Sequence, residues 1–258
     1  FCVVHDVTEQ KNLERLKQDF VDMISHDLRS PLTSMLGAMT LVLEGARGAV
    51  SVPVQEEVEK AARNIEKLIT FVNDLLDFQK LESGRIELQV REHELTDIFN
   101  DTLEMVRGFA ESREVAIALP ERPGSVRCDR DRIVQTLVNL VSNAIKFSPA
   151  GATVALAVDA TPDFIELSVI DSGPGVPPEY AERIFEAFEQ TPAAARAREG
   201  TGLGLAICKL IVLAHVGVIG VGARDDGSSG SKFWLRLPTQ PDLPFDARVQ
   251  VEDASINA

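Results

Sequence analysis

Cysteine is scarce in this sequence of 258 residues and follows no pattern typical of a bound metal or a disulfide. The three residues Cys2, Cys128 and Cys208 are odd in number and widely spaced, and they form no Cys-x-x-Cys pair. These spacings argue against a zinc site and a disulfide framework. We therefore expect a reducing, cytoplasmic environment for this fragment.

Long apolar runs are also missing. No uninterrupted run approaches the roughly 18–20 residues that cross a bilayer, and no signal peptide is visible. We expect no membrane contact by this fragment. Because the sequence begins at Phe1 rather than Met, it indicates a fragment or processed form, and an upstream sensor or membrane anchor would lie outside it.

Basic residues are outnumbered, with 26 Lys and Arg against 40 Asp and Glu and a formal net charge of -14. A nucleic-acid partner is not expected, because phosphate binding needs clustered Lys and Arg. The 45% hydrophobic and 26% charged residues are typical of a soluble protein with one or two domains. No internal repeat is present.

The most informative stretch is residues 20–32. Apolar side chains recur at steps of three and four, which predicts a helix with one buried stripe beside His26. A histidine on such a helix is more often an ordinary surface or core residue than a reactive group. Here Asp27 can accept one ring proton and leave the other nitrogen free to attack, and Pro31 predicts a bend one turn beyond. This pattern favours a nucleophile on a bendable helix.

Heptad-like spacing extends on both sides of this stretch. It continues to residue 43, breaks at residues 44–49, and resumes in a second helix that starts at Ser51 and Pro53 and ends at Ser83 and Gly84. The apolar positions of the two helices are Leu13, Leu16, Leu32, Leu36, Met39, Leu43, Val54, Val58, Ala61, Ile65, Leu68, Val72 and Leu75. Residues 9–84 thus predict an antiparallel helical hairpin. One hairpin cannot bury both of its sides, so we expect a homodimer with a four-helix bundle.

The period changes after residue 84. Strands are expected at residues 85–90, 115–119, 153–158, 164–170, 218–223 and 232–237, and helices at 95–111, 129–147 and about 200–214. The predicted class is α+β, in which residues 85–238 form an α/β sandwich with helices on one face of a mixed sheet. Residues 239–258 lack periodicity and are expected to be a loose tail.

Three polar clusters in this second part are candidates for a ligand site. Asn139, Asn143 and Lys146 share one helix face, where an amide oxygen suits Mg²⁺ and an ammonium suits a triphosphate, although such faces are usually just solvated. Asp171 ends a strand and can accept the exocyclic amine of adenine, and Gly173 and Gly175 allow close approach. As a turn alone, this motif is common.

The third cluster opens the helix that follows residue 200. Glycine there frees backbone amides for an anion, and the helix N-terminus adds a favourable dipole. The stretch lacks the Gly-Lys-Ser/Thr ending of a Walker loop, and no Rossmann strand directly precedes it. The candidate phosphate-binding residues are Gly200, Thr201, Gly202, Leu203 and Gly204.

Together these motifs resemble the boxes of sensor histidine kinases, in the order of that family, over roughly residues 9–238. Residues 25–32, Ser-His-Asp-Leu-Arg-Ser-Pro-Leu, resemble the H-box, and residues 139–147 resemble the N-box. Residues 171–175 and 200–207 resemble the two glycine boxes. The resemblance implies a GHKL-type ATP-binding domain. Residues 1–8 are similar to the end of a PAS sensor domain, and an ordinary strand-to-helix junction is the alternative.

What the resemblance implies for chemistry is specific. His26 would accept the γ-phosphoryl group of Mg·ATP with Asp27 as orienting base, and a receiver-domain aspartate of a response regulator would then take it. Asn143 would be the Mg²⁺ ligand, Asn139 and Lys146 would lie near the phosphates, and Asp171 would read adenine.

Other positions depart from the family pattern or match it loosely. Phe185 and Phe188 resemble the F-box beside an ATP lid, although such pairs are more often plain core, and Arg196 and Arg198 could reach a γ-phosphate. The sequence has His-Val-Gly at residues 215–217 where His-Gly-Gly is usual, and the loop before Gly230 is slightly long. Ser30 replaces the usual Thr or Asn, which puts a phosphatase activity in doubt.

Two other functions compete with this interpretation. One is a different ATPase with the same nucleotide fold, of the gyrase, MutL or anti-sigma serine-kinase type, which lacks the histidine hairpin. The other is a non-catalytic scaffold that dimerises and binds a regulator. His26 argues against the first, and the glycine boxes with Asn143 and Asp171 argue against the second.

Overall fold

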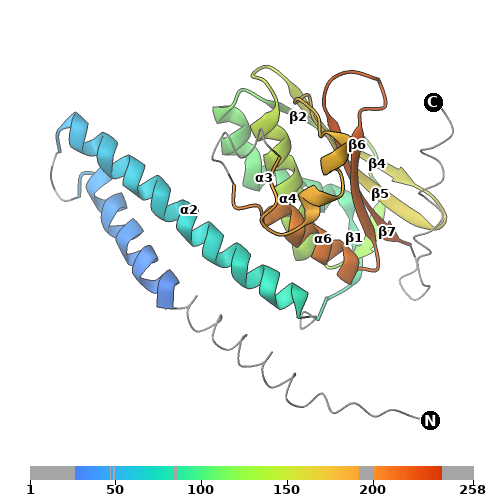
Figure 1. Ribbon diagram of the computed structural model, residues 1–258, viewed down its shortest axis with the longest axis horizontal. Coiled ribbons are helices and arrows are strands. Elements are labelled where there is room, and N and C mark those ends of the chain that lie inside the picture. The colour runs from blue at the N-terminus through green and yellow to red at the C-terminus, as the bar shows by residue number, and fades with distance from the viewer. Residues whose placement is uncertain (1–26, 47, 49, 84–86, 192–199, 240–258) are drawn as a thin grey trace, which may run out of the picture. The chain divides into compact units, whose positions relative to one another are not determined.

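The computed structural model describes residues 27–46, 48, 50–83, 87–191 and 200–239. The chain divides between Ser83 and Gly84 into two compact units, which are described separately (Figure 1). The predictions on the strand at residues 1–8, on His26, on the lid arginines Arg196 and Arg198, and on residues 240–258 lie outside the described residues.

The first unit contains a helical hairpin. One helix is described over residues 27–43, and α2 follows at Val52–Glu82 with Ser51 at its N-cap and Pro53 in its first turn, as predicted. The Arg29 guanidinium donates two hydrogen bonds, from Nε (3.1 Å) and Nη2 (2.8 Å), to Oδ1 of Asn73, so it joins the two helices. The helix is continuous through Pro31 over residues 27–43, and the bend expected one turn beyond His26 stays a prediction.

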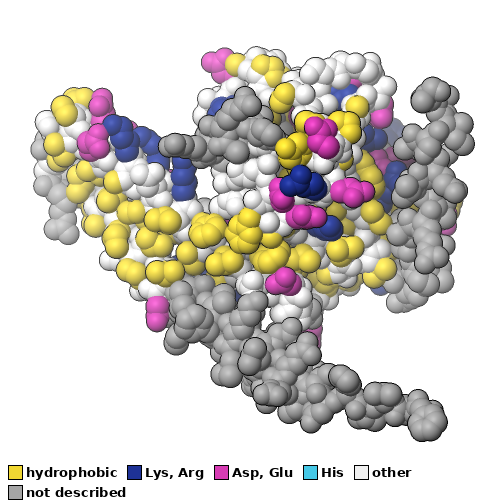
Figure 2. All heavy atoms as spheres, viewed as in Figure 1, with side chains coloured by type: hydrophobic (Ala, Val, Ile, Leu, Met, Phe, Trp, Pro, Cys, Tyr) yellow, Lys and Arg dark blue, Asp and Glu magenta, His cyan; other side chains and the backbone are white. Residues whose placement is uncertain are grey.

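Apolar residues of the hairpin divide into two sets. The predicted seam of the first helix, Leu32, Leu36, Met39 and Leu43, is half-buried. In α2 the buried residues are Ala62, Ile65, Val72, Leu76 and Leu81. Other apolar side chains remain at least 40% exposed in the single chain, namely Leu28, Met35, Leu41, Val54 and Leu68. Figure 2 shows apolar side chains on the surface of the hairpin.

The second unit is built on a five-stranded sheet in the order β2-β4-β5-β7-β6. Only β2 and β4 are parallel, and the other neighbours are antiparallel. The strands are β2 (Ala116–Ala118), β4 (Thr153–Ala160), β5 (Phe164–Ile170), β6 (Val218–Ala223) and β7 (Ser231–Pro238). Leu167 and Val169 of β5 and Leu235 of β7 are buried on one face of the sheet, which is its core face. Glu166 and Ser168, on the opposite side of β5, are buried as well.

Three helices cover this core face (Figure 1): α3 (Leu95–Ser112), α4 (Arg130–Phe147) and α6 (Gly204–Ala214). α4 contacts β4 and β5, whereas α6 contacts β6 and β7. The short 3-10 helices η1 (Pro178–Tyr180) and η2 (Arg183–Phe185) lie in the connection after β5. The predicted α/β sandwich with a mixed sheet is confirmed.

One predicted element is wrong. No strand forms over the described residues 87–90, and a two-stranded sheet pairs β1 (Arg91–Glu94) with β3 (Ser125–Cys128) instead. The amide of Gln89 donates a hydrogen bond to Oδ2 of Asp129 (2.9 Å). In this segment a side chain therefore accepts the hydrogen bond that a neighbouring strand would accept in a sheet. Pairing with a distant strand, rather than local alternation, sets the position of β1.

Cys128 and Cys208, the two cysteines among the described residues, are buried and form no disulfide. A search of the same part of the chain finds no helix with the length and apolar character needed to span a membrane.

Candidate functional site

Helix α4 supplies the first wall of the site. Asp129 caps it by accepting a hydrogen bond from the amide of Arg132 (3.3 Å). One face of α4, with Ile133, Leu137 and Leu140, is completely or almost completely buried. The residues Asn139, Asn143 and Lys146 recur at steps of four and three and are all half-buried, so the helix presents their polar groups along one edge of its core face.

The loop before α6 lies against this polar face. A Cβ atom placed on Gly204 would be 3.1 Å from Oδ1 of Asn139, and one on Gly200 would be 3.6 Å from Nζ of Lys146. Residues more than 50 positions apart in the sequence are thus neighbours. The absence of a side chain at Gly204 is what allows the first turn of α6 to approach Asn139.

The conformation of this loop requires glycine at two positions. Gly200 and Gly202 have φ values of 98° and 74°, in the left-handed region. Leu203 is completely buried and anchors the loop, and its amide donates to the hydroxyl of Thr201 (3.2 Å). Leu203 therefore fixes the loop from the core, whereas the glycines shape the surface that an anion would meet.

Phe185 and Phe188 differ in their surroundings. Phe185 is buried, but Phe188 is 59% exposed and has φ 67°. The amide of Phe188 donates a hydrogen bond to the carbonyl of Gly202 (2.9 Å), so the backbone at Phe188 is held against the loop before α6. Phe188 is not a core residue, so a plain-core interpretation fits Phe185 alone.

The second wall is the turn after β5. Asp171 is buried, and its Oδ1 accepts hydrogen bonds from the amides of Gly173 (2.8 Å) and Ser231 (3.1 Å). A Cβ on Gly173 would lie 2.9 Å from the carbonyl oxygen of Phe147, the last residue of α4. Gly175 has φ 80°. This turn therefore sits against the C-terminal end of the helix that carries the polar face.

Burial raises the pKa of Asp171, and the two amide hydrogen bonds and the nearby Arg224 guanidinium oppose that rise. Both amide hydrogen bonds go to Oδ1, and the Ser231 hydroxyl also hydrogen-bonds to the carboxylate. Oδ2, which neither of these amides contacts, is suited to accept an amine from a ligand.

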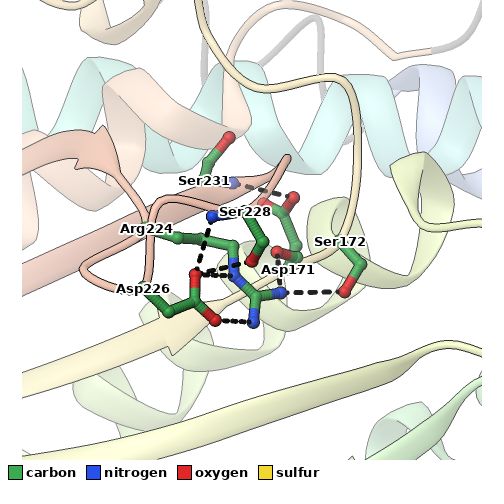
Figure 3. Close-up of polar contacts among 6 residues, drawn as sticks. All are labelled: Asp171, Ser172, Arg224, Asp226, Ser228 and Ser231. Atoms are coloured by element: carbon green, nitrogen blue, oxygen red, sulfur yellow. Dashed lines mark hydrogen bonds and ion pairs between the residues drawn. The ribbon is translucent and has the colours of Figure 1, made fainter.

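Several residues of this site were missed in the sequence. Arg224 and Ser231 come from the end of β6 and the start of β7, and they hold the Asp171 turn (Figure 3). Ser148, just after α4, accepts a hydrogen bond from the amide of Ser172 (3.3 Å). The only sequence signal was the long loop before Gly230, because hydrogen bonds between distant loops leave no periodic pattern.

The oxygen ligands at this site suit a hard cation that is coordinated mainly by a bound ligand and water. Among the residues that the structure describes, no group of three or more His, Cys, Asp or Glu side chains could hold a metal. Asn143 offers one amide oxygen on the polar face of α4. A single protein oxygen fits Mg²⁺ bound to a triphosphate and water, and it does not fit a complete protein cage.

The expected phosphoacceptor motif belongs to the other unit. Asp27 is exposed at the start of the described part of the first helix, and His26 precedes it outside the described residues. The site described above is thus made by α4, the Asp171 turn, the loop before α6 and the β6–β7 loop, all within the second unit.

Comparison with known proteins gives two family matches. Residues 16–84 match the His Kinase A (phospho-acceptor) domain, and residues 128–241 match the histidine kinase-, DNA gyrase B- and HSP90-like ATPase domain. The chain is 34% identical over 251 residues to the sensor histidine kinase WalK of Bacillus subtilis, covering 95% of this chain and 40% of WalK. It is 32% identical to the alginate biosynthesis sensor protein KinB of Pseudomonas aeruginosa, covering 92% of this chain and 39% of KinB.

Solved structures agree in fold. Full-length ShkA in complex with AMPPNP is 31% identical, with a TM-score of 0.70 over 86% of this chain and 47% of that chain. The mycobacterial sensor histidine kinase MprB is 29% identical, with a TM-score of 0.51 over 59% of this chain and 99% of that chain. The chain spans 40% or less of the length of the curated relatives named above.

Proposed function

Because the chain belongs to the sensor histidine kinase family, we propose that it transfers the γ-phosphoryl group of ATP to His26. The group then passes to an aspartate in the receiver domain of a response regulator, which makes the chain the transmitter part of a two-component system. We also propose a cytoplasmic location for this part of the protein, since ATP is its substrate.

The observation that carries the proposal is the meeting of three motifs in one unit. The polar face of α4, the Asp171 turn and the glycine-rich start of α6 adjoin through Asn139 with Gly204, Lys146 with Gly200, and Phe147 with Gly173. An adenine reader, a cationic side chain and a phosphate-binding helix start thus lie together. That set suits a nucleoside triphosphate better than any part of it alone.

We assign the residues as follows. Oδ2 of Asp171 accepts the exocyclic amine of adenine, and Gly173 and Gly175 let the ring approach the backbone. The Lys146 ammonium and the segment from Gly200 to Gly204 meet the phosphates, with Thr201 and Leu203 holding that segment in shape. Asn139 supports the start of α6 beside the phosphates.

Mg²⁺ is the second component we propose, with Asn143 as its protein ligand. When bound, the ion would neutralise charge on the phosphate oxygens as the phosphoryl group is transferred. The chain's own task is to orient ATP, and the half-buried position of Asn143 on the same face as Lys146 supports this role.

The proposed acceptor is a ring nitrogen of His26. In the first step this nitrogen bonds to the γ-phosphorus as the bond to the β–γ bridging oxygen breaks, and ADP leaves. Asp27 accepts the proton of the other ring nitrogen and orients the imidazole. In the second step a carboxylate oxygen of the receiver aspartate bonds to phosphorus, and the phosphorus–nitrogen bond breaks.

We propose that the active form is a homodimer. Leu28, Met35, Leu41, Val54 and Leu68 are exposed on the hairpin of a single chain. A second hairpin would cover this apolar surface in a four-helix bundle, which agrees with the two-sided apolar spacing of both helices.

The test is labelling with ATP that carries ³²P at the γ-position, in the presence of Mg²⁺. We expect an acid-labile label on the wild-type chain, no label on His26→Ala, and none on Asn143→Ala. Glu104→Gln, an exposed change on α3 and outside the proposed site, serves as the matched control. Label that survives in His26→Ala would favour a serine kinase, and a chain that binds no ATP would be a scaffold.

A further inference from the structure

The loop between β6 and β7 makes an unusual set of contacts with the Asp171 turn (Figure 3). From Arg224, Nη1 donates to the main-chain carbonyl of Asp171 (3.1 Å) and to Oγ of Ser172 (2.9 Å). One guanidinium thus holds two consecutive residues of the turn. Arginine is suited to this because its donors form a rigid planar fork.

A second residue of the same loop orients this guanidinium. Oδ1 and Oδ2 of Asp226 accept hydrogen bonds from Nε (3.1 Å) and Nη2 (2.7 Å) of Arg224. Asp226 is fixed in turn, since its Oδ1 also accepts from the amide of Ser228 (3.0 Å) and from the Ser228 hydroxyl. The Arg224 side chain is only 21% exposed, whereas that of Asp226 is 56% exposed.

The remainder of the loop completes the attachment. Oγ of Ser229 donates to the carbonyl of Gly173 (2.9 Å), and the amide of Asp171 donates to the carbonyl of Ser231 (2.9 Å). Gly230 has φ 138°, and a Cβ there would lie 2.8 Å from Cδ of Arg224 and would collide with the carbonyl of Asp171. Glycine at this position is therefore what lets the arginine side chain pass over the loop.

We propose that Arg224, oriented by Asp226, is a positioning residue that directs Oδ2 of the Asp171 carboxylate at the adenine amine. This inference rests on the proposed nucleotide site and adds a determinant of base specificity to it. The guanidinium contacts the main chain of Asp171 rather than its carboxylate, so it leaves Oδ2 available for the ligand. Without the guanidinium, the carbonyl of Asp171 and the hydroxyl of Ser172 lose their shared donor.

The selectivity for adenine over guanine distinguishes a positioning role of Arg224 from a general contribution to the stability of the unit. Adenine presents an amine where guanine presents a carbonyl oxygen, so an aimed carboxylate accepts the first and repels the second. If the Asp171 carboxylate is no longer held in this orientation, the affinities for the two bases become more equal. General destabilisation of the unit would instead weaken both nucleotides by the same factor.

The experiment measures the dissociation constants of ADP and GDP for the full chain by calorimetry. In Arg224→Ala we expect ADP to bind about tenfold more weakly and the preference for ADP over GDP to fall by a similar factor. Arg224→Lys keeps the charge but lacks the fork, so it should restore only part of the loss. Asp226→Asn should show a smaller loss of the same kind.

The double variant tests whether the pair acts as a unit. If Asp226 works through Arg224, then Arg224→Ala combined with Asp226→Asn binds ADP as Arg224→Ala does alone. Arg130→Ala is the matched control, because Arg130 pairs with Asp101 on the helices of the same unit (2.6 Å) and has no role in this loop. Both its affinity and its selectivity should equal those of the wild type.

The outcomes separate this inference from the proposed function. A wild-type chain that binds no ADP overturns the nucleotide site itself. A wild type that binds ADP, with an unchanged ADP to GDP ratio in folded Arg224→Ala, overturns the positioning role alone. If Arg224→Ala fails to fold, the selectivity of Arg224→Lys and Asp226→Asn decides in the same way, with their melting temperatures as a check on folding.

Discussion

The imidazole of His215 accepts a hydrogen bond at Nε2 from the main-chain amide of Asp129, 86 residues earlier, at 2.9 Å. Its Nδ1 lies 2.8 Å from the carbonyl oxygen of Ile211 and donates to it, which fixes the neutral tautomer with the proton on Nδ1. Asp129 caps α4, so one buried histidine links the end of α6 to the start of the helix that carries Asn139, Asn143 and Lys146.

This link makes the second unit sensitive to acid. Burial lowers the pKa of His215, although the bond to Ile211 and the Asp129 charge oppose the change. The unfolded chain then binds more protons than the folded one as pH falls through the ordinary histidine value of about 6.5, so stability falls with it. We expect His215→Gln to be less stable at pH 8 by about 1–2 kcal/mol and to lose less stability on acidification. Urea unfolding from pH 5 to 8 measures this, with His93→Gln as control. Equal pH slopes for wild type and His215→Gln would contradict the assignment.

Val216 should be replaceable with a gain in stability. It follows the end of α6 with φ 58°, in the left-handed region, and is 45% exposed, so its side chain contributes little packing. Its amide donates to the carbonyl of Leu213 (2.9 Å), and the amide of Gly217 donates to the carbonyl of Val212 (2.9 Å). This pattern is typical of a helix end that favours glycine at residue 216. Val216→Gly should stabilise the unit by about 1 kcal/mol. Ala223→Gly, at an exposed strand position, should instead destabilise it, and denaturant titration compares the two. A loss of stability in Val216→Gly would refute the strain.

As the solution is acidified, nucleotide binding should weaken at a higher pH than the one at which an ordinary aspartate titrates. Burial raises the pKa of Asp171, and only the ionised carboxylate accepts the adenine amine fully. As pH falls through this raised pKa, affinity for ADP should fall, with proton release on binding in that range. Asp171→Asn should bind ADP weakly and with a flatter pH profile. Calorimetry in buffers of different ionisation enthalpy counts the protons, and an unchanged pH profile in Asp171→Asn would exclude the role.

Gly202 has no room for a methyl group. A Cβ there would lie 2.8 Å from Cα and 2.9 Å from the carbonyl carbon of Phe188, at φ 74°. Gly202→Ala should therefore shift the loop before α6 and weaken ADP binding at least tenfold, an order-of-magnitude expectation for a displaced phosphate loop. Gly222→Ala, with no atom within 4 Å of the added carbon, is the control and should bind normally. Normal binding by Gly202→Ala would mean that the loop does not touch the phosphates.

The proposed dimer depends on apolar residues that remain exposed in a single hairpin. Leu68 is 50% exposed in the middle of α2. A charge at this position would have to be buried in the proposed four-helix bundle, so Leu68→Glu should shift the chain to a monomer at micromolar concentration. Sedimentation velocity reads the change. Lys67→Glu, one residue earlier on the exposed side, should remain dimeric, and a dimeric Leu68→Glu would place the interface elsewhere.

Sequence patterns located most of the fold and left out specific contacts. The 3.6-residue period of α4 and the apolar, β-branched runs of β5 and β6 predicted those elements closely. The glycine motif located the start of the helix to within a few residues: it was expected at about residue 200, and α6 begins at Gly204. The strand expected at residues 85–90 was wrong, and β3 was missed, because a short pairing across 33 residues has no local signal. Arg224 was missed because its partners are backbone and hydroxyl groups, which no spacing rule connects.

The hydrogen bond from Asp171 to Ser231 extends the β5–β7 ladder by one residue into the turn. Asp171, the proposed adenine-binding residue, is thus held by the last strand of the sheet, although it lies 60 residues earlier in the chain. During synthesis, ADP affinity should therefore arise only after β7 has left the ribosome, since contacts between distant segments form late in folding. Nucleotide binding would report that the whole unit has been made.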